Sequence, residues 1–326
     1  MIIRRRSKPL PLKKLDTRLP TTFPRYTEME IDAQKRRKGY VGEQQVDYHL
    51  EQFADDYIIL QDVNLKVNGK NVQLDNIIIT EYGIIPVEVK NYDGTITFNT
   101  ALNTFTRSNG EVEQGYKHPI TQAENQQRNL QTWLQQYNLQ HIPVYFFVAI
   151  SDPRTVIKVV GDEEKIGKIV AHGENIPKLL REKVNELKSH DLRKFDPKKV
   201  GHMILNACEN YDGEIMKTYQ VQKSDLLTGV HCPSCKRLGM RRIFGNWLCL
   251  NCNHRSKYAH HRALDDYLLL IRPFITNKAC MRFLHLESRG IATRILQHSN
   301  LLYDQKRRVW RKKRSALVQG GHARNV

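Results

Sequence analysis

The sequence has no long hydrophobic run. No window approaches the ~18 uninterrupted apolar residues of a membrane span, and the richest run, Val144 to Ile150, has the length of a single strand. The basic start of the chain is not followed by an apolar region of signal-peptide length. A Gly-x₄-Gly-Lys-Ser/Thr loop for binding ATP phosphates is also missing. We therefore expect a cytoplasmic protein without a membrane span, and we discount an ATP-dependent enzyme.

Cysteine is scarce, with 6 in 326 residues. Four of them form two Cys-x-x-Cys pairs, which in a reducing compartment indicate metal binding rather than disulfides. Two pairs on tight turns can supply the four thiolates of a closed, structural Zn²⁺ site. The spacing predicts a zinc ribbon at residues 229–257 that folds with its metal. Redox cysteines or an iron–sulfur centre are the alternatives. The predicted zinc ligands are Cys232, Cys235, Cys249 and Cys252.

Acidic residues are scarce at both ends of the chain, and the net charge is +18. Residues 1–38 carry 12 Lys or Arg against 4 Asp or Glu, and residues 229–326 carry 20 against 4. Residues 39–228 are mildly acidic, with 20 against 26. Such asymmetry favours a polyanionic partner, first of all nucleic acid. A membrane surface is less favoured because no basic amphipathic helix with an apolar face is present. The alternative is that these charges only solvate the surface.

The order of predicted elements indicates a mixed α/β domain at residues 39–190. Residues 1–38 are expected to form a basic arm and the start of the first helix, and residues 191–228 a connector. Gly39 and Gly42 in that helix imply close backbone packing. The expected helices are 27–53, 119–137 and 176–187, and the expected strands are 57–67, 72–80, 83–91, 95–98, 104–107 and 143–150.

Two carboxylates and a lysine fall on one face of a predicted strand pair. Glu88 and Lys90 are two residues apart in a strand and therefore point to the same side. With a two-residue loop at 81–82, the antiparallel register places Asp75 directly opposite Glu88, about 5 Å away. Their repulsion, about 3 kcal/mol at an effective dielectric near 20, favours a bound Mg²⁺ or Mn²⁺. Lys90 would then lie beside the metal-bound water.

Two further polar residues adjoin this set. Glu43 precedes the apolar Val46 and Leu50 by one and two helical turns, so it borders the buried face of the first helix. Gln122 lies at the start of the helix that follows the strands. Both could reach the carboxylate pair. The alternative is an ordinary ion-pair ladder at the edge of a sheet, with neither residue involved.

Four segments of the domain carry a resemblance to a known family. They are GYVGE from Gly39, QLDNI from Gln73, GIIPVEVKN from Gly83 and PITQ from Pro119. In this order, over residues about 39–150, the chain resembles the nuclease-related domain (NERD) family of the PD-(D/E)xK superfamily. At the proline position of the superfamily the chain has Leu74, but NERD members generally lack that proline too.

The resemblance implies a restriction-endonuclease-like fold and a Mg²⁺-dependent phosphodiesterase. It implies that Asp75 and Glu88 bind the metal and that Lys90 is the catalytic lysine. Glu43 and Gln122 would support them.

Residues 258–326 are predicted to form a small, basic, winged-helix-like domain and a tail. Three helical stretches are expected, at 263–271, 277–284 and 288–298, followed by a hairpin at 301–313. The third helix would be the recognition helix of a helix-turn-helix, and the hairpin would be its wing. A small helical bundle with a solvated basic face is the alternative. The candidate nucleic-acid contacts are Arg289, Thr293, Arg294, Lys306, Arg307, Arg308 and Arg311.

Together these features predict a metal-dependent nuclease that hydrolyses phosphodiester bonds, with DNA favoured over RNA. The zinc ribbon and the winged-helix-like domain would bind and position the substrate. The alternative is a catalytically inactive adaptor or regulator that binds nucleic acid through the same basic modules.

Overall fold

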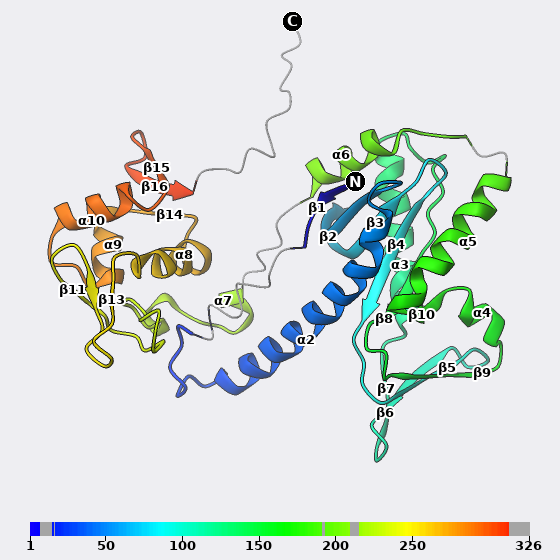
Figure 1. The fold of residues 1–326 in the computed structure, drawn as a ribbon, viewed down its shortest axis with the longest axis horizontal. Coiled ribbons are helices and arrows are strands. Elements are labelled where there is room, and N and C mark those ends of the chain that lie inside the picture. Colours follow the sequence, from blue (N-terminus) through cyan, green and yellow to red (C-terminus); the bar gives the residue numbers. More distant parts are fainter. Residues whose placement is uncertain (7–14, 16, 191–192, 209–214, 313–326) are drawn as a thin grey trace, which may run out of the picture. The chain divides into compact units, whose positions relative to one another are not determined.

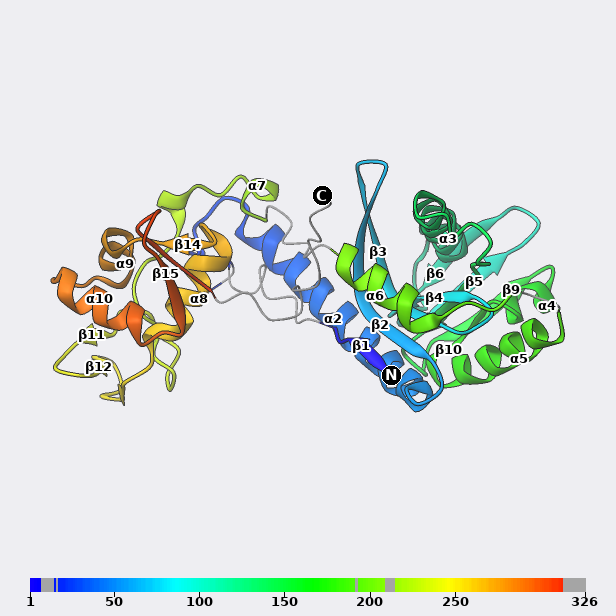
Figure 2. The same ribbon diagram turned by 90° about the horizontal axis from the view of Figure 1, so that it is seen from above.

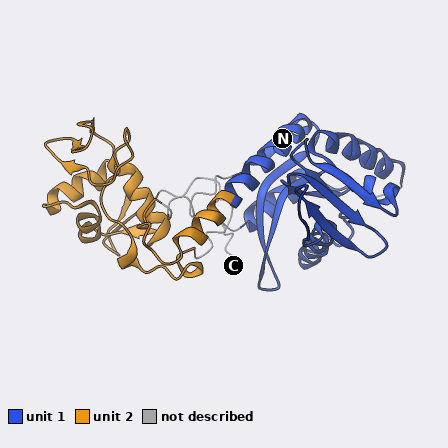
Figure 3. Cartoon of the chain, turned by 90° about the horizontal axis from the view of Figure 1, so that it is seen from below, with its two compact units in different colours: residues 1–8, 35–211 blue, residues 9–34, 212–326 orange. Residues whose placement is uncertain are grey.

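The computed structural model describes residues 1–6, 15, 17–190, 193–208 and 215–312 (Figure 1). The chain divides into two compact units (Figure 3). Unit 1 comprises residues 1–8 and 35–211, and unit 2 comprises residues 9–34 and 212–326. Helix α2 (Tyr26–Leu50) therefore contributes residues to both. Among the described residues, no helix is both long enough and apolar enough to cross a membrane.

Unit 1 is built on a six-stranded sheet with the order β1-β2-β3-β4-β8-β10 (Figure 2). Strands β2, β3 and β4 pair antiparallel, whereas β1 with β2, β4 with β8, and β8 with β10 pair parallel. The predicted mixed sheet is thereby confirmed. The strands are β1 (Ile2–Arg4), β2 (Ile58–Val67), β3 (Lys70–Ile79), β4 (Ile84–Lys90), β8 (Phe147–Ile150) and β10 (Val170–His172).

Helices cover both faces of this sheet. On one face α2 and α5 (Ile176–Ser189) bury apolar side chains such as Val46 and Leu180. On the other face, α3 (Pro119–Gln136) and α6 (Pro197–Ala207) pack against a second apolar cluster. Helix α6 lies in the stretch that was expected to be a connector. The regularly spaced apolar residues of α6 were not recognised as a helix because the sequence around them is polar.

A second, four-stranded sheet has the order β7-β6-β5-β9. Its buried Phe98 and Phe105 share a core with Val148 of β8 and Ala123 of α3, so this sheet is fixed against the first. It carries one wall of the pocket described below. Its elements are β5 (Thr95–Asn99), β6 (Thr104–Ser108), β7 (Glu113–Gly115) and β9 (Val156–Val160), and α4 (Glu163–Gly167) follows β9.

The tight turn at residues 81–82 sets the register of β3 and β4 as predicted. The Thr80 N–H donates to the Gly83 carbonyl at 3.0 Å, and the Thr80 hydroxyl accepts from the Tyr82 and Gly83 N–H groups. Cα pairs then run from Ile79 with Ile84 to Asn76 with Val87. The ladder ends there, one pair before Asp75 and Glu88, which brings both carboxylates to the place where the two strands stop pairing.

Unit 2 contains a small three-stranded sheet at residues 241–256 and then a helix–strand–helix–helix–strand–strand sequence. The last three strands of unit 2 form another sheet, with the order β14-β16-β15. This sequence of helices and strands, with this sheet, is the arrangement of a winged helix. Position 313 of the predicted hairpin lies outside the described residues. The elements are α7 (Ile215–Thr218), β11 (Arg241–Arg242), β12 (Trp247–Leu248), β13 (Arg255–Ser256), α8 (His260–Leu270), β14 (Phe274–Ile275), α9 (Asn277–Leu284), α10 (Arg289–Gln297), β15 (Leu301–Asp304) and β16 (Val309–Lys312).

A buried arginine ties the N-terminal segment of unit 2 to its C-terminal modules. Arg18 and Asp266 are fully buried, and the Arg18 Nε donates to Asp266 Oδ2 at 2.9 Å. The Arg18 Nη1 also donates to the carbonyls of Leu227 and Gly229, and its guanidinium lies over the ring of Phe283. Arg18 therefore has a structural role within unit 2. Not every positive charge of the basic N-terminal region is available to bind a ligand.

Candidate functional site

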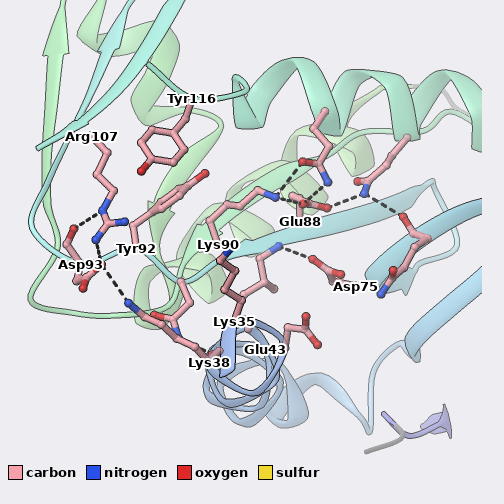
Figure 4. Close-up of a pocket in the computed structure, with 16 residues that line it drawn as sticks. Lys35, Lys38, Glu43, Asp75, Glu88, Lys90, Tyr92, Asp93, Arg107 and Tyr116 are labelled. Atoms are coloured by element: carbon pink, nitrogen blue, oxygen red, sulfur yellow. Dashed lines mark hydrogen bonds and ion pairs between the residues drawn. The ribbon is translucent and has the colours of Figure 1, made fainter. Parts of the chain in front are cut away.

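An open pocket of about 770 Å³ lies in unit 1 (Figure 4). The five residues predicted for the nuclease site all line it, although they come from four different elements. Helix α2 provides one of them, β3 one, β4 two and α3 one. The structure therefore brings together the complete predicted set: Glu43, Asp75, Glu88, Lys90 and Gln122.

Asp75 is buried at the end of the β3–β4 ladder. Its Oδ2 accepts a hydrogen bond from the Val89 N–H at 2.9 Å, which directs the carboxylate toward β4. Burial, and then the negative charges of Glu88 and Glu43, hold the pKa of Asp75 well above its usual value of 3.8. The nearby Arg6 guanidinium lowers the pKa of Asp75, but by less than burial and the two carboxylates raise it. A cation would therefore be stabilised next to this carboxylate.

Glu88 is held by three donors. Its Oε1 lies 2.6 Å from the Lys90 Nζ and accepts from Gln122 Nε2 at 2.6 Å, and its Oε2 accepts from Gln126 Nε2 at 2.6 Å. The Lys90 Nζ also donates to Gln122 Oε1 at 2.9 Å. Burial alone would lower the pKa of Lys90, but the charge of Glu88 and their hydrogen bond raise it. Lys90 is therefore a cation at neutral pH.

Gln126 is a site residue that the sequence analysis missed. It lies one helical turn after Gln122, so both side chains project from the same face of α3 toward the carboxylates. Its Nε2 also donates to the Gln73 carbonyl on β3 at 3.0 Å. The spacing of four residues was the signal that could have revealed it.

A glycine brings helix α2 close to the strand ends and so positions Glu43. A Cβ added at Gly42 would lie 2.4 Å from Ser151 Oγ and 2.8 Å from Asn91 Cβ, so a larger residue would push the helix away. The nearest atom to a Cβ at Gly39 is Glu43 Oε1, at 3.9 Å. The prediction of close packing is therefore confirmed for Gly42 and wrong for Gly39.

Arg6 lies next to these residues and binds two of them, although it belongs to the stretch that was expected to form a basic arm. Its side chain is 3% exposed. The guanidinium donates two hydrogen bonds to Asp47, at 2.9 and 3.0 Å, one to Glu43 Oε2 at 2.6 Å and one to the Asp75 carbonyl at 2.8 Å. One cation thus joins α2 to β3 beside the candidate metal ligands. Nothing local in the sequence distinguishes Arg6 from Arg4 and Arg5.

We expect Arg6→Ala to lower the free energy of unfolding by about 3–5 kcal/mol, because it leaves buried carboxylates without their counter-ion. Urea unfolding of the full chain measures this loss. Arg5→Ala is the matched control, since Arg5 is exposed and its pair with Glu51 should contribute less than about 1 kcal/mol. Equal stability of the two variants would show that Arg6 does not hold the site together.

The four cysteines of unit 2 form a compact cluster, and their sulfur atoms all lie within 4.8 Å of one another. The Cys232–Cys252 and Cys235–Cys249 sulfur distances are both 3.6 Å. A tetrahedron of Zn–S bonds of about 2.3 Å needs sulfurs about 3.8 Å apart. None of these cysteines is in a disulfide. The predicted cluster therefore suits structural zinc.

The predicted nucleic-acid contacts lie on α10 and on the β15–β16 hairpin of unit 2. Arg289 and Arg294 are exposed on the helix. Thr293 is partly buried, donates to the Arg289 carbonyl and accepts from Asn277, so its hydroxyl is already engaged within the unit. The four predicted contacts in the hairpin are all exposed: Lys306, Arg307, Arg308 and Arg311.

Comparison with known families supports the assignment of unit 1. Residues 38–151 match the family model of the nuclease-related domain. No curated protein and no solved structure matches the chain. The matched range contains Asp75, Glu88 and Lys90, but neither Arg6 nor the cysteine cluster. Residues 38–151 are therefore a nuclease-related domain, a class of domain that suggests nuclease-like function and binding of nucleic acid.

Proposed function

We propose that the protein is a metal-dependent nuclease that hydrolyses phosphodiester bonds, with DNA preferred over RNA. One observation carries the proposal. Asp75 and Glu88, two buried carboxylates on adjacent strands, line one open pocket together with the cationic Lys90, inside a nuclease-related domain. Two carboxylates beside an amine are the groups that a metal-assisted phosphodiesterase needs.

The donor set fits a hard divalent cation, Mg²⁺ or Mn²⁺, held by Asp75 and Glu88. Both ligands offer carboxylate oxygens, the type that such cations prefer, and the pocket is open enough for phosphate and water to complete the coordination. Burial and neighbouring negative charge raise the pKa of Asp75, so a cation bound beside it would favour the charged carboxylate. When bound, such a metal supplies an activated water and polarises the phosphate.

The surrounding side chains then have distinct roles. The Lys90 ammonium is within reach of the negative charge that develops on the phosphate oxygens during hydrolysis. Gln122 and Gln126 hold Glu88 in place through its two oxygens. Arg6 holds Glu43 and the backbone of Asp75. The site is thus fixed by hydrogen bonds before substrate binds.

We assign substrate binding to unit 2. The exposed arginines of α10 and of the β15–β16 hairpin can contact phosphates, which gives affinity but little sequence preference. Such binding weakens steeply with salt because each phosphate contact releases counter-ions.

Incubation of the full-length protein with single-stranded and double-stranded DNA and RNA tests the proposal. We expect cleavage with Mg²⁺ or Mn²⁺, no cleavage with EDTA, and faster cleavage of DNA than of RNA. Salt-sensitive binding without cleavage in either metal would instead establish the alternative, a nucleic-acid-binding adaptor with an inactive nuclease-like domain.

A further inference from the structure

The pocket of unit 1 has a second half that the proposed chemistry does not use. Besides the carboxylate half, it is lined by Lys38 of α2, Tyr92 and Asp93 after β4, Arg107 of β6 and Tyr116 after β7. Figure 4 shows Tyr92 and Tyr116 between Lys90 and the group formed by Asp93, Arg107 and Lys38. We name this part of the pocket the aromatic–basic half.

The charged side chains of this half could bind an anion, because they include more cations than carboxylates. Asp93 pairs with Lys38 Nζ at 3.0 Å and also with Arg107, so two cations share one carboxylate. Lys38 and Asp93 are about half exposed, and ion pairs of this kind contribute little to stability. A phosphate can therefore replace Asp93 as the partner of Lys38 and Arg107 at low cost.

The aromatic rings offer a stacking surface. The Tyr116 side chain is 43% exposed, although its backbone N–H is fixed by a hydrogen bond to the Phe105 carbonyl at 2.9 Å. Its ring meets Tyr92 edge-on at 6.5 Å, and Tyr92 in turn packs on Phe105 at 5.4 Å. A rigidly supported, exposed aromatic ring beside a cationic pair is the combination that binds single-stranded nucleic acid.

We propose that the aromatic–basic half is a subsite for an unpaired nucleotide next to the scissile phosphate. Lys38 and Arg107 bind the neighbouring phosphate, and Tyr116 stacks on the base. Inside a duplex both faces of each base are covered by its neighbours, so an internal base can stack on this ring only when it is unpaired. The inference rests on the proposed function and narrows its substrate class to single strands and to duplexes with single-stranded tails.

Fluorescence of 2-aminopurine in a short single strand reports stacking directly, and measuring it with the full chain without added Mg²⁺ or Mn²⁺ separates binding from cleavage. We expect wild type to quench this fluorescence. We expect Tyr116→Ala to lose most of the quenching and to bind the strand about tenfold more weakly, the equivalent of about 1.4 kcal/mol. Tyr116→Phe, which keeps the ring, should restore both. Tyr48→Ala, at an exposed tyrosine outside the pocket, is the matched control.

A second variant tests the phosphate-binding part. Asp93→Asn removes the carboxylate that competes for Lys38 and Arg107, so it should tighten binding of the same strand about threefold. Weaker binding by Asp93→Asn would overturn the assignment of these two cations to phosphate.

The outcomes distinguish the subsite from the chemistry. If wild type cleaves nucleic acid but Tyr116→Ala quenches and binds like wild type, the subsite is wrong and the proposed function stands. If no metal supports cleavage but quenching depends on the Tyr116 ring, the subsite stands and the proposed catalytic function is wrong.

Discussion

Replacing Asp75 by Asn, or Glu88 by Gln, is expected to lower the rate of metal-dependent cleavage about a thousandfold, with little change in binding of nucleic acid. Each substitution keeps the size of the side chain but removes one of two charged metal ligands. Loss of several kcal/mol of metal-derived stabilisation, at about 1.4 kcal/mol per tenfold, gives a factor of this size. Single-turnover cleavage with Mg²⁺ and Mn²⁺, together with a binding assay without added Mg²⁺ or Mn²⁺, measures both effects.

The Asp75→Asn variant should also become more stable in the absence of metal. Because the pKa of Asp75 is raised by burial and by Glu88 and Glu43, the folded state holds the proton of Asp75 more tightly than the unfolded chain does. Metal-free stability therefore falls as the pH rises above 3.8, the usual pKa of this group. Asp75→Asn removes that loss. We expect its thermal midpoint without added Mg²⁺ to exceed that of wild type at neutral pH, and Mg²⁺ to raise the midpoint of wild type but not of this variant.

Glu182→Gln is the matched control, because Glu182 is exposed on α5, outside the pocket. This variant should cleave and melt like wild type. Full cleavage by Asp75→Asn and Glu88→Gln would remove the carboxylate pair from the mechanism. Lower stability of Asp75→Asn than of wild type without added Mg²⁺ would contradict the charge repulsion between the two carboxylates.

The candidate site was predictable because its geometry is set by local rules. A two-residue turn fixes the register of β3 and β4, and alternation along a strand places Glu88 and Lys90 on one side. The position of Asp75 follows from these two facts alone. Two knuckles of the Cys-x-x-Cys type likewise determine the cysteine cluster, because each turn delivers two sulfurs to one point.

The parts that were missed depend on contacts between distant segments. Arg6 reaches Glu43 across 37 residues of sequence and Asp75 across 69, and a run of three arginines gives no indication of which one is buried. The aromatic–basic half of the pocket needs β5 and β6 to pack against β8, and no periodicity in the sequence predicts that contact. Strand β9 and helix α6 were overlooked for the same reason, since β9 is held by pairing with β5 at the edge of its sheet and α6 by packing against the first sheet.

Removal of zinc is expected to unfold the ribbon of unit 2. Metal binding contributes about 10 kcal/mol or more to the folding of such modules, whereas the strands at residues 241–256 have only two residues each. The ribbon also shares its core with the winged helix, since Cys232, Cys249 and Trp247 belong to one apolar cluster with residues of α8, α9 and α10. Loss of the metal should therefore loosen the whole of unit 2.

Zinc can be removed with a strong chelator, or its binding weakened by Cys249→Ser. Unfolding of unit 2 is then followed by tryptophan fluorescence in a Trp133→Phe background. That background leaves Trp247 and Trp310, both buried in unit 2, as the reporters. We expect a red shift of the emission and loss of most salt-sensitive binding to nucleic acid. Metal analysis should find one zinc per chain in the untreated protein and none after chelation.

The control for this experiment is Cys280→Ala. Cys280 is a buried thiol of the same unit that lies outside the cysteine cluster, so it should behave as a small apolar residue. Its variant should keep both the zinc and the emission of Trp247. If chelation removes the metal without shifting the emission, the cysteines bind zinc without folding the unit. If the purified protein instead shows the visible absorption of an iron–sulfur centre, the cluster holds iron, and the basic modules of unit 2 owe their fold to a redox-active cofactor.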